Sequence, residues 1–252
     1  MLSATSLFAE PFLLVSLPDE EHLAVFEINS RTGELTHIRD HKIESDPGPM
    51  SVSQDGNTLF VSLRNYGGLA SYAIDHETSG LKHLSTIKAD RDPAYHWQDH
   101  SGQWLITAYY HTGRVSVHAV DKTGVLNQEA AFFGETELNA HGVAATNDNR
   151  FVYIPHTGPN LILQFEFDDK TGQLKLLENG SLSSAESTGP RHLATHPKQP
   201  WLYGDYEQGN KVVFYEIRPN GLLTTKQLVS SVPADWPAGK GATARMTLSD
   251  DG

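Results

Sequence analysis

Short stretches in which apolar and polar residues alternate, separated by turns rich in Gly, Asn and Asp, occupy nearly the whole chain. Five of these stretches share one form, an alternating run that ends at or near an acidic residue: LAVFEIN, LASYAID, VSVHAVD, LILQFEFD and KVVFYEI. A period of two is typical of a β-strand with one buried face. Helical periodicity is hard to find, and Gly and Pro recur too often for long helices. The pattern therefore predicts an all-β protein.

A glycine turn follows each of these runs at a nearly constant interval. The turn glycines are Gly33, Gly80, Gly124, Gly172 and Gly221, which gives steps of 47, 44, 48 and 49 residues. Four units carry a second marker upstream, a polar turn before an aromatic-rich strand: QDGNTLFVS, HSGQWLITA, NDNRFVYIP and PKQPWLYGD. Four short strands at a period of about 40 to 50 residues are typical of a β-propeller blade. The sequence thus predicts one propeller domain over residues 1–252, with about five blades of four antiparallel strands.

The two ends of the chain break the repeat. The first unit begins at FLLVS, which matches the second strand of later units, so its innermost strand is missing. The final stretch, ATARMTLSDDG, matches an innermost strand and the turn after it. Either the ring closes after five blades by pairing ARMTLS with FLLVS, or the chain lacks the C-terminal part of a larger propeller. A chain that stops on a turn glycine favours the second arrangement.

The charge balance limits the classes of partner. The chain has 19 Lys and Arg against 31 Asp and Glu, a formal net charge of −12, so we expect neither a nucleic-acid nor a membrane partner. An anionic ligand would have to be captured by a local cluster of cations. The chain has no Cys, and no segment reaches transmembrane length. The start, MLSATSLFAEPFLLVS, is a poor signal peptide, so we expect a cytoplasmic location, with a periplasmic or secreted one left open.

Blade topology predicts which loops meet. Two antiparallel strands return the chain to the same face, so the loop before an innermost strand lies beside the loop after the second strand. In the fifth unit this places Arg191 and His192 opposite Glu207, and in the fourth it places His141 with His156. The third and second units contribute, in the same way, Tyr95, His96, Tyr110, His111, Arg64, Asn65 and Tyr66. We expect these residues at the mouth of a central channel.

This combination suits an anion with a reactive carbonyl. Arginine offers a rigid fork of donors for a carboxylate or phosphate, and a histidine can activate water or carry a proton. Structural roles are open as well: Arg191 can tie two loops through Glu207, and His141 and His156 can be turn or packing residues.

Other chemistry has less support in the sequence. It contains no G-x-S-x-G, no H-E-x-x-H and no P-loop, which leaves serine hydrolases, zincins and nucleotide binding unsupported. The loops before the innermost strands carry Pro, His and Arg instead of the oxygen ligands that calcium requires. We therefore predict neither a metal nor a cofactor.

Two long segments carry a resemblance to a known family. GPRHLATHPKQPWLYGDYEQGNKVVFYEI and NAHGVAATNDNRFVYIPHTGPNLILQFEFD resemble the lactonase family of seven-bladed β-propellers, which includes bacterial 6-phosphogluconolactonases and fungal carboxy-cis,cis-muconate cyclases. The similarity runs from about Phe12 to the C-terminus. It implies two further blades after residue 252. It also implies a channel-mouth site in which His141, Arg191 and Glu207 match positions proposed as catalytic in the cyclase members.

The sequence also departs from the family pattern. The family usually has Asn-Glu where this chain has Tyr206 and Glu207, and an acidic residue is common where this chain has Arg245. His192 matches the histidine of the family's Gly-Pro-Arg-His segment. No role is carried onto Arg245.

The resemblance and the residues together predict an enzyme that hydrolyses an anionic sugar lactone, most like 6-phosphogluconolactone. His141 would be the general base, Arg191 with His192 would bind the anionic group or the developing oxyanion, and Glu207 would orient Arg191. Further expected substrate contacts are His156, Tyr110 and Asn65.

Two alternatives stay open. The same groups can close a lactone from a muconate-type diacid, and a propeller can simply bind a ligand or a protein. The expected partner is a small lactone or carboxylate, and an open propeller with unpaired strand edges can oligomerise.

Overall fold

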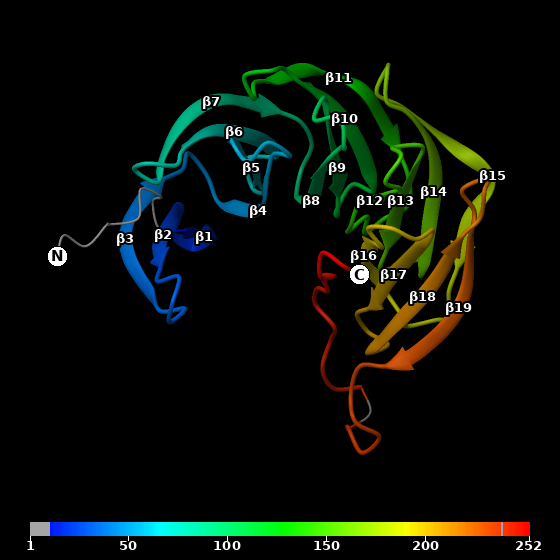
Figure 1. The fold of residues 1–252 in the computed structure, drawn as a ribbon. Helices are drawn as coiled ribbons and strands as arrows, with labels where there is room; N and C mark the ends of the chain where they lie inside the picture. The colour runs from blue at the N-terminus through cyan, green and yellow to red at the C-terminus, as the bar shows by residue number, and fades with distance from the viewer. Residues whose placement is uncertain (1–10, 238) are drawn as a thin grey trace.

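The computed structural model describes residues 11–237 and 239–252. Within them the chain forms five antiparallel sheets that stand side by side in an arc around a common axis (Figure 1). Each sheet pairs strands that follow one another in the sequence. The predicted all-β propeller architecture is confirmed.

The strands of each blade follow the repeat read from the sequence. The first blade contains β1 (Phe12–Leu17), a short 3₁₀ turn η1 (Pro18–Glu20), β2 (His22–Ile28) and β3 (Leu35–Lys42). The second contains β4 (Pro47–Val52), β5 (Thr58–Leu63), β6 (Gly68–Asp75) and β7 (Gly80–Lys88). The third contains β8 (Pro93–Gln98), β9 (Trp104–Tyr109), β10 (Arg114–Val120) and β11 (Leu126–Glu135). The fourth contains β12 (Ala144–Ala145), β13 (Phe151–His156), β14 (Leu161–Asp168) and β15 (Gln173–Ser183). The fifth contains β16 (Pro190–Thr195), β17 (Trp201–Tyr206), β18 (Lys211–Ile217) and β19 (Leu223–Ser230).

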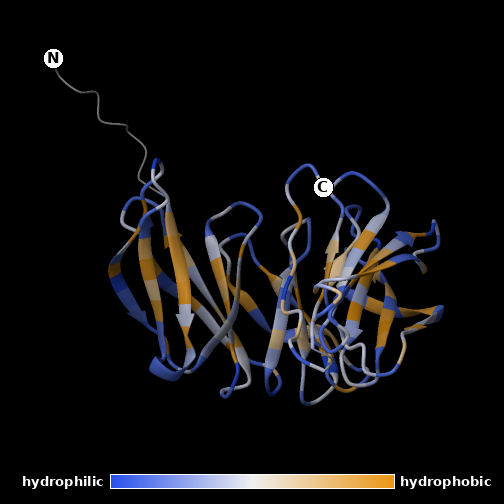
Figure 2. Ribbon diagram, turned by 90° about the horizontal axis from the view of Figure 1, so that it is seen from below, coloured by the Kyte–Doolittle hydropathy of each residue, from blue (hydrophilic) through white to orange (hydrophobic). Residues whose placement is uncertain are grey.

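The first strand of each four-stranded blade lies nearest the axis, and the last lies outermost (Figure 1). Figure 2 shows the strands rich in apolar residues and the loops at the two ends of the blades rich in polar residues. Within the described residues the first blade has three strands, β1 to β3, in agreement with the innermost strand that the sequence lacks. Among the described residues, no helix is long and apolar enough to cross a membrane.

The arc does not close. Within the described residues β1 pairs only with β2, and residues 242–249 form no strand. The final segment instead passes through the middle of the arc as an irregular chain (Figure 1). The predicted innermost strand at ATARMTLS is therefore wrong for this structure, because no neighbouring strand offers it a ladder of hydrogen bonds. Closure by pairing ARMTLS with FLLVS is likewise not found.

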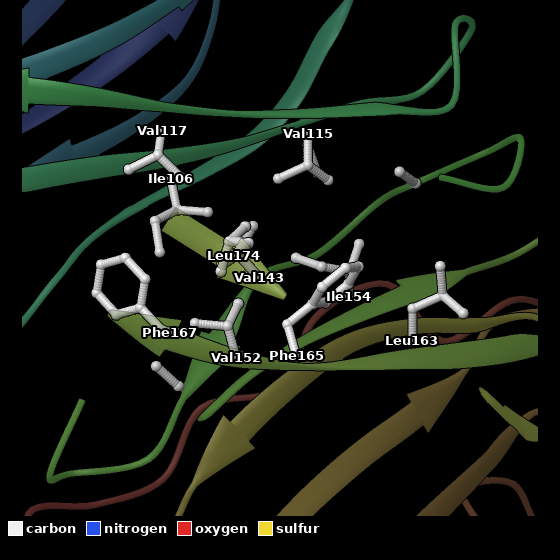
Figure 3. Packing of buried hydrophobic residues seen from close by; sticks show 13 residues of the cluster. Ile106, Val115, Val117, Val143, Val152, Ile154, Leu163, Phe165, Phe167 and Leu174 are labelled. Atoms are coloured by element: carbon white, nitrogen blue, oxygen red, sulfur yellow. The ribbon is translucent and has the colours of Figure 1, made fainter. Parts of the chain in front are cut away.

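The largest apolar cluster fills the space between the third and fourth blades (Figure 3). It joins Ile106 and Val117 to Val152, Ile154 and Phe165, all within 5% of full burial. Burying one such side chain stabilises a protein by roughly 1.5 to 3 kcal/mol. The second strands of the second and fourth blades have a blade on each side, and these strands, β5 and β13, are buried at every position.

The recurring glycine turn packs against the blade before it. The Cβ that a larger residue would add at Gly172 lies 2.6 Å from the ring of Trp104, and at Gly221 it lies 2.3 Å from the ring of Phe151. Both glycines have φ near +80°, at +72° and +84°. Trp104 and Phe151 are the first residues of β9 and β13. The two sequence markers therefore recur together because the turn of one blade contacts the second strand of the preceding blade.

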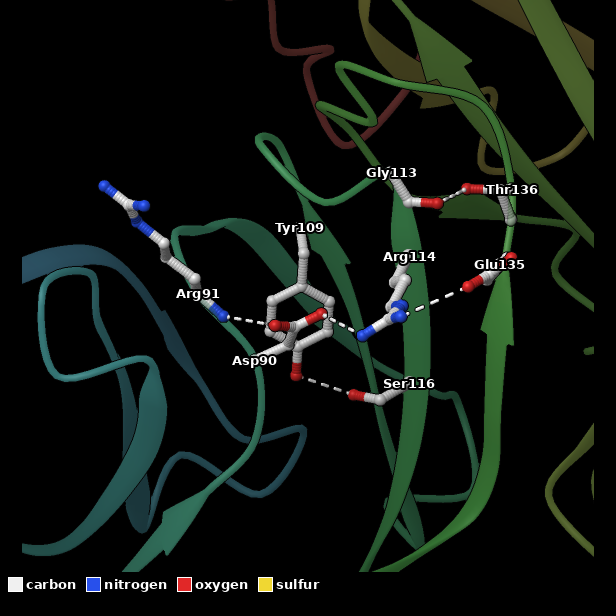
Figure 4. A network of polar contacts seen from close by, with 8 residues as sticks. All are labelled: Asp90, Arg91, Tyr109, Gly113, Arg114, Ser116, Glu135 and Thr136. Carbon is white, nitrogen blue, oxygen red and sulfur yellow. Dashed lines mark hydrogen bonds and ion pairs between the residues drawn. The ribbon is translucent and has the colours of Figure 1, made fainter.

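A polar network fixes the loop before β8 (Figure 4). Arg114 lies 3.5 Å from the Asp90 carboxylate and 3.1 Å from that of Glu135. Tyr109 and Ser116 share a buried hydrogen bond of 2.8 Å just below. The network ties the loop that leads into the innermost strand to the outer strands of the same blade.

Candidate active site

Irregular pairing at the start of the innermost strands turns side chains toward the axis. The register between β16 and β17 shifts between Pro190 and Leu193, so Arg191 and His192 lie in a bulge. The pairings of β4 and β8 shift at the corresponding places. A bulge redirects side chains and interrupts the ladder. The buried carboxylate of Asp205 stabilises this one by accepting the His192 backbone N–H at 2.6 Å.

A cavity of about 410 Å³ lies where these strand starts meet the loops that follow the second strands. We call it the arginine cavity. Its walls are formed by Pro49, Arg64, Ala94, Tyr95, Tyr110, His141, Arg191, His192, Glu207 and Arg245. Five of the seven residues given a catalytic or substrate-contact role from the sequence therefore share one cavity: His141, Arg191, His192, Glu207 and Tyr110. Arg64 and Tyr95, which the blade topology also predicts at the channel mouth, line it as well.

Two selected residues lie elsewhere. Asn65 does not line the arginine cavity; it is exposed, and its backbone N–H bonds to Asp46 at 2.8 Å. Its neighbour Arg64 lines the cavity instead. His156 is fully buried, with Nδ1 3.3 Å from the Leu138 carbonyl oxygen. The structure thus gives no geometric support to substrate contacts by Asn65 or His156.

Two donors from the wall of the arginine cavity converge on one oxygen atom. The Arg191 guanidinium bonds to the carbonyl oxygen of Ala244, and His192 Nδ1 lies 2.7 Å from the same oxygen. Arg191 Nε also lies 3.5 Å from the Glu207 carboxylate. Glu207 follows β17, and Arg191 starts β16, so this ion pair joins the two loops as the topology predicts. The arrangement can hold one partly negative oxygen between a cation and an imidazole.

His141 lies directly beside this pair. Its ring contacts those of His192 and Tyr110 edge to face, with centroids 4.8 Å and 5.6 Å away. Its Nδ1 is buried and has no hydrogen-bond partner among the described residues. Burial, reinforced by the charges of Arg191 and His192, lowers the pKa of His141 to about 3. His141 is therefore neutral at pH 7 and can accept a proton.

The Arg64 guanidinium on the cavity wall is already paired with a carboxylate. Asp92 lies 2.5 Å from the Arg64 guanidinium and 2.5 Å from His111 Nδ1. Burial, with the charge of Arg191, lowers the pKa of His192 to about 4. No group of three or more His, Asp or Glu side chains in the described part of the chain could hold a metal ion.

We expect acid to destabilise the fold below about pH 6.5. The pKa is about 4 for His96, His156 and His192 and about 3 for His141, chiefly through burial. The unfolded chain binds these protons near pH 6.5. Each histidine therefore removes roughly 1.4 kcal/mol of stability per pH unit from about pH 6.5 down to its folded pKa. Asp205, whose pKa burial raises to about 6, acts in the opposite direction between about pH 6 and 4.

Urea unfolding from pH 8 to pH 4.5 measures this effect. The unfolding midpoint should fall steadily once the pH drops below about 6.5. A midpoint that is constant or rises over this range would show that the buried histidines do not carry the depressed pKa values.

Comparison with known proteins gives three findings. The family described as Lactonase, 7-bladed beta-propeller, matches residues 11–252. A 6-phosphogluconolactonase of Enterobacter sp. (strain 638) is 29% identical over 113 residues. That alignment covers 44% of this chain and 34% of the relative, so it spans about a third of the relative's length.

Solved structures share the fold. The periplasmic gluconolactonase PpgL of Pseudomonas aeruginosa superposes with a TM-score of 0.86 at 22% identity, over 95% of this chain and 73% of that one. A protein from Lactobacillus plantarum gives a TM-score of 0.82 at 21% identity, over 96% and 72% of the two chains. At such identities the superpositions establish the architecture alone.

Proposed function

Because this chain belongs to the lactonase family of seven-bladed β-propellers, we propose that it hydrolyses a small anionic sugar lactone, most like 6-phosphogluconolactone, in the arginine cavity. The observation that carries the proposal is the convergence of Arg191 and His192 on one carbonyl oxygen, that of Ala244. A lactone carbonyl is an oxygen of the same kind, and it becomes more negative during hydrolysis. The proposed site is the mouth of the propeller channel.

Binding places the lactone carbonyl oxygen where the Ala244 oxygen lies. Ala244 is exposed, and residues 244–248 donate no backbone hydrogen bond, so the peptide plane between Ala244 and Arg245 can rotate its carbonyl away while the Arg245 side chain stays on Tyr95. Glu207 holds the Arg191 fork from the other side. A fork oriented before the substrate arrives loses little entropy when it binds.

Hydrolysis then needs a base and an oxyanion site. His141 takes a proton from a water molecule as its oxygen attacks the lactone carbonyl carbon, and the carbonyl oxygen becomes an oxyanion between Arg191 and His192. The tetrahedral intermediate collapses, and the bond from carbonyl carbon to ring oxygen breaks. The ring oxygen leaves as a hydroxyl after taking the proton from His141, and the product is the open-chain acid. Donors placed where charge develops are often the largest single source of rate enhancement.

We expect the negative charge of the substrate to raise the pKa of His141. Part of the depression of the His141 pKa comes from Arg191, His192 and Arg64. An anion between these cations offsets their charge, so the pKa of His141 rises when substrate binds. A base whose pKa approaches the working pH transfers protons more effectively.

The pH dependence of kcat/KM tests the base assignment. With neutral gluconolactone, which does not ionise in this range, this parameter reports the free enzyme, in which the pKa of His141 is about 3, and the base must be neutral to act. We therefore expect kcat/KM to be constant from pH 7 down to about pH 5 wherever the protein stays folded. An acid limb with a midpoint between pH 6 and 7 would contradict the environment assigned to His141.

Assays with different substrates distinguish lactone hydrolysis from lactone closure and from simple ligand binding. The Enterobacter relative is named for a phosphorylated lactone, and the Pseudomonas structure for gluconolactone. A phosphorylated substrate fits the cytoplasmic location that the sequence favours. Incubation with a muconate-type diacid tests lactone closure, since the same proton transfer and carboxylate binding serve the reverse direction. A protein that turns over neither compound, but binds a ligand or protein after Arg191 is removed, would be a binding propeller.

A further inference from the structure

The three arginines of the arginine cavity differ in their partners. Arg64 is paired with Asp92 at 2.5 Å, and Arg191 with Glu207 at 3.5 Å. Arg245 lines the same cavity without a carboxylate within ion-pair distance in the part of the chain described by the structure. Its positive charge is therefore the least compensated of the three.

Arg245 is held by an aromatic ring. Its guanidinium carbon lies 5.5 Å from the centre of the Tyr95 ring, and Nη2 lies 3.4 Å from the Tyr95 hydroxyl. The Tyr95 ring in turn contacts the His192 ring at 5.4 Å. The Tyr95 ring thus lies between the Arg245 guanidinium and His192 of the proposed oxyanion site. Its charge also contributes to lowering the pKa of His192.

Arg245 also borders a second cavity. A space of about 350 Å³ adjoins the arginine cavity and shares Tyr95, His192 and Arg245 with it. The walls of this second space include Trp97 and Asp250. Because Tyr95 and Arg245 line both spaces, Arg245 borders the space next to the proposed site of the lactone carbonyl.

We propose that Arg245, held over Tyr95, binds a second anionic group of the substrate, a phosphate ester, and so makes the protein select a phosphorylated sugar lactone over the neutral one. The inference rests on the proposed lactone hydrolysis. In this arrangement Arg191 with His192 binds the reacting carbonyl, and Arg245 binds the anionic group at the other end of the substrate. A guanidinium suits this task because its planar fork can hold two phosphate oxygens at once.

The test compares Arg245→Gln with Lys240→Gln. Both variants remove one positive charge from the same exposed segment, but Lys240 lines neither cavity. Values of kcat/KM are measured with 6-phosphogluconolactone, with neutral gluconolactone and with a sugar lactone that carries a carboxylate in place of the phosphate.

For Arg245→Gln we expect kcat/KM for the phosphorylated lactone to fall about tenfold or more, mainly through KM, because a charge-assisted hydrogen bond pair is lost. The value for the neutral lactone should stay at that of the wild type, and Lys240→Gln should match the wild type for both. Arg245→Glu should lower the phosphorylated value further. Equal losses for both lactones, or no loss for either, overturn the proposal. A loss confined to the carboxylate-bearing lactone overturns the assignment to phosphate.

A binding measurement separates failure of this inference from failure of the proposed function. If the wild type hydrolyses no lactone, the proposed function fails. Calorimetric titration with 6-phosphogluconate and with gluconate still tests Arg245. Weaker binding of the phosphorylated acid alone to Arg245→Gln supports the subsite, and unchanged binding, or no binding by the wild type, rejects it.

Discussion

Replacing Arg191 with alanine is expected to lower kcat for lactone hydrolysis by about 10² to 10³-fold, the usual cost of removing one donor from an oxyanion site. The guanidinium meets His192 at a single oxygen in the structure, so its loss leaves the developing negative charge with one donor. Because the charge grows toward the transition state, the loss should fall mainly on kcat. Initial rates, with spontaneous hydrolysis subtracted, measure this directly.

Arg218→Ala provides the matched control. Arg218 belongs to the same blade but follows β18 at the opposite end, where its Nε bonds to Thr224 at 2.6 Å. This variant should keep the wild-type rate. If Arg191→Ala and Arg218→Ala behave alike, Arg191 serves only to tie its loop to Glu207, and the oxyanion assignment is wrong.

Replacing His141 with alanine is expected to reduce kcat by about 10² to 10⁴-fold, the range typical of a lost general base. The ring is neutral at pH 7, lies 4.8 Å from the His192 ring and has a buried Nδ1 without a partner among the described residues. Proton exchange with the cavity therefore has to run through Nε2. Because the base is neutral before it acts, KM should change little.

His83→Ala is the control for this experiment. His83 is exposed on β7, where it bonds to Thr86 at 2.8 Å, and its loss should leave the rate unchanged. Urea midpoints for both variants show whether they are folded. A folded His141→Ala protein with the wild-type rate and pH profile would remove His141 from the mechanism.

The architecture follows from the sequence because its signal is local and repeated. The glycine turn and the aromatic strand start recur at one period, and the structure supplies the reason: Gly172 lies on Trp104 and Gly221 on Phe151, each in the preceding blade. Gly33 has open space around its missing Cβ, and the described residues place no earlier blade against it. Gly124 makes the corresponding contact with Thr58 at the start of β5, so the third, fourth and fifth blades all pack this turn on the blade before them.

The sequence predicts which loops meet at the site, but it does not predict which side chains of those loops face the cavity. Alternation of antiparallel strands brings Arg191, Glu207 and His141 to one place, and the structure agrees. Which of two adjacent residues faces the cavity depends on the local bulges, so Asn65 points elsewhere and Arg64 lines the wall.

The burial of a single polar side chain depends on how the blades pack in the folded chain, so the sequence pattern does not predict it. His156 appears in a loop-like setting in the sequence, yet it is fully buried between blades. Arg245 carries no local signal for its contact with Tyr95, because the two residues lie 150 positions apart.

The most direct test of the account is the release of acid from freshly generated 6-phosphogluconolactone, followed at constant pH near 7 with the purified protein and corrected for spontaneous opening. We predict a rate proportional to protein concentration that Arg191→Ala abolishes to near background and Arg218→Ala retains. A folded protein that adds nothing to the spontaneous rate, with this lactone and with gluconolactone, would contradict lactone hydrolysis in the arginine cavity.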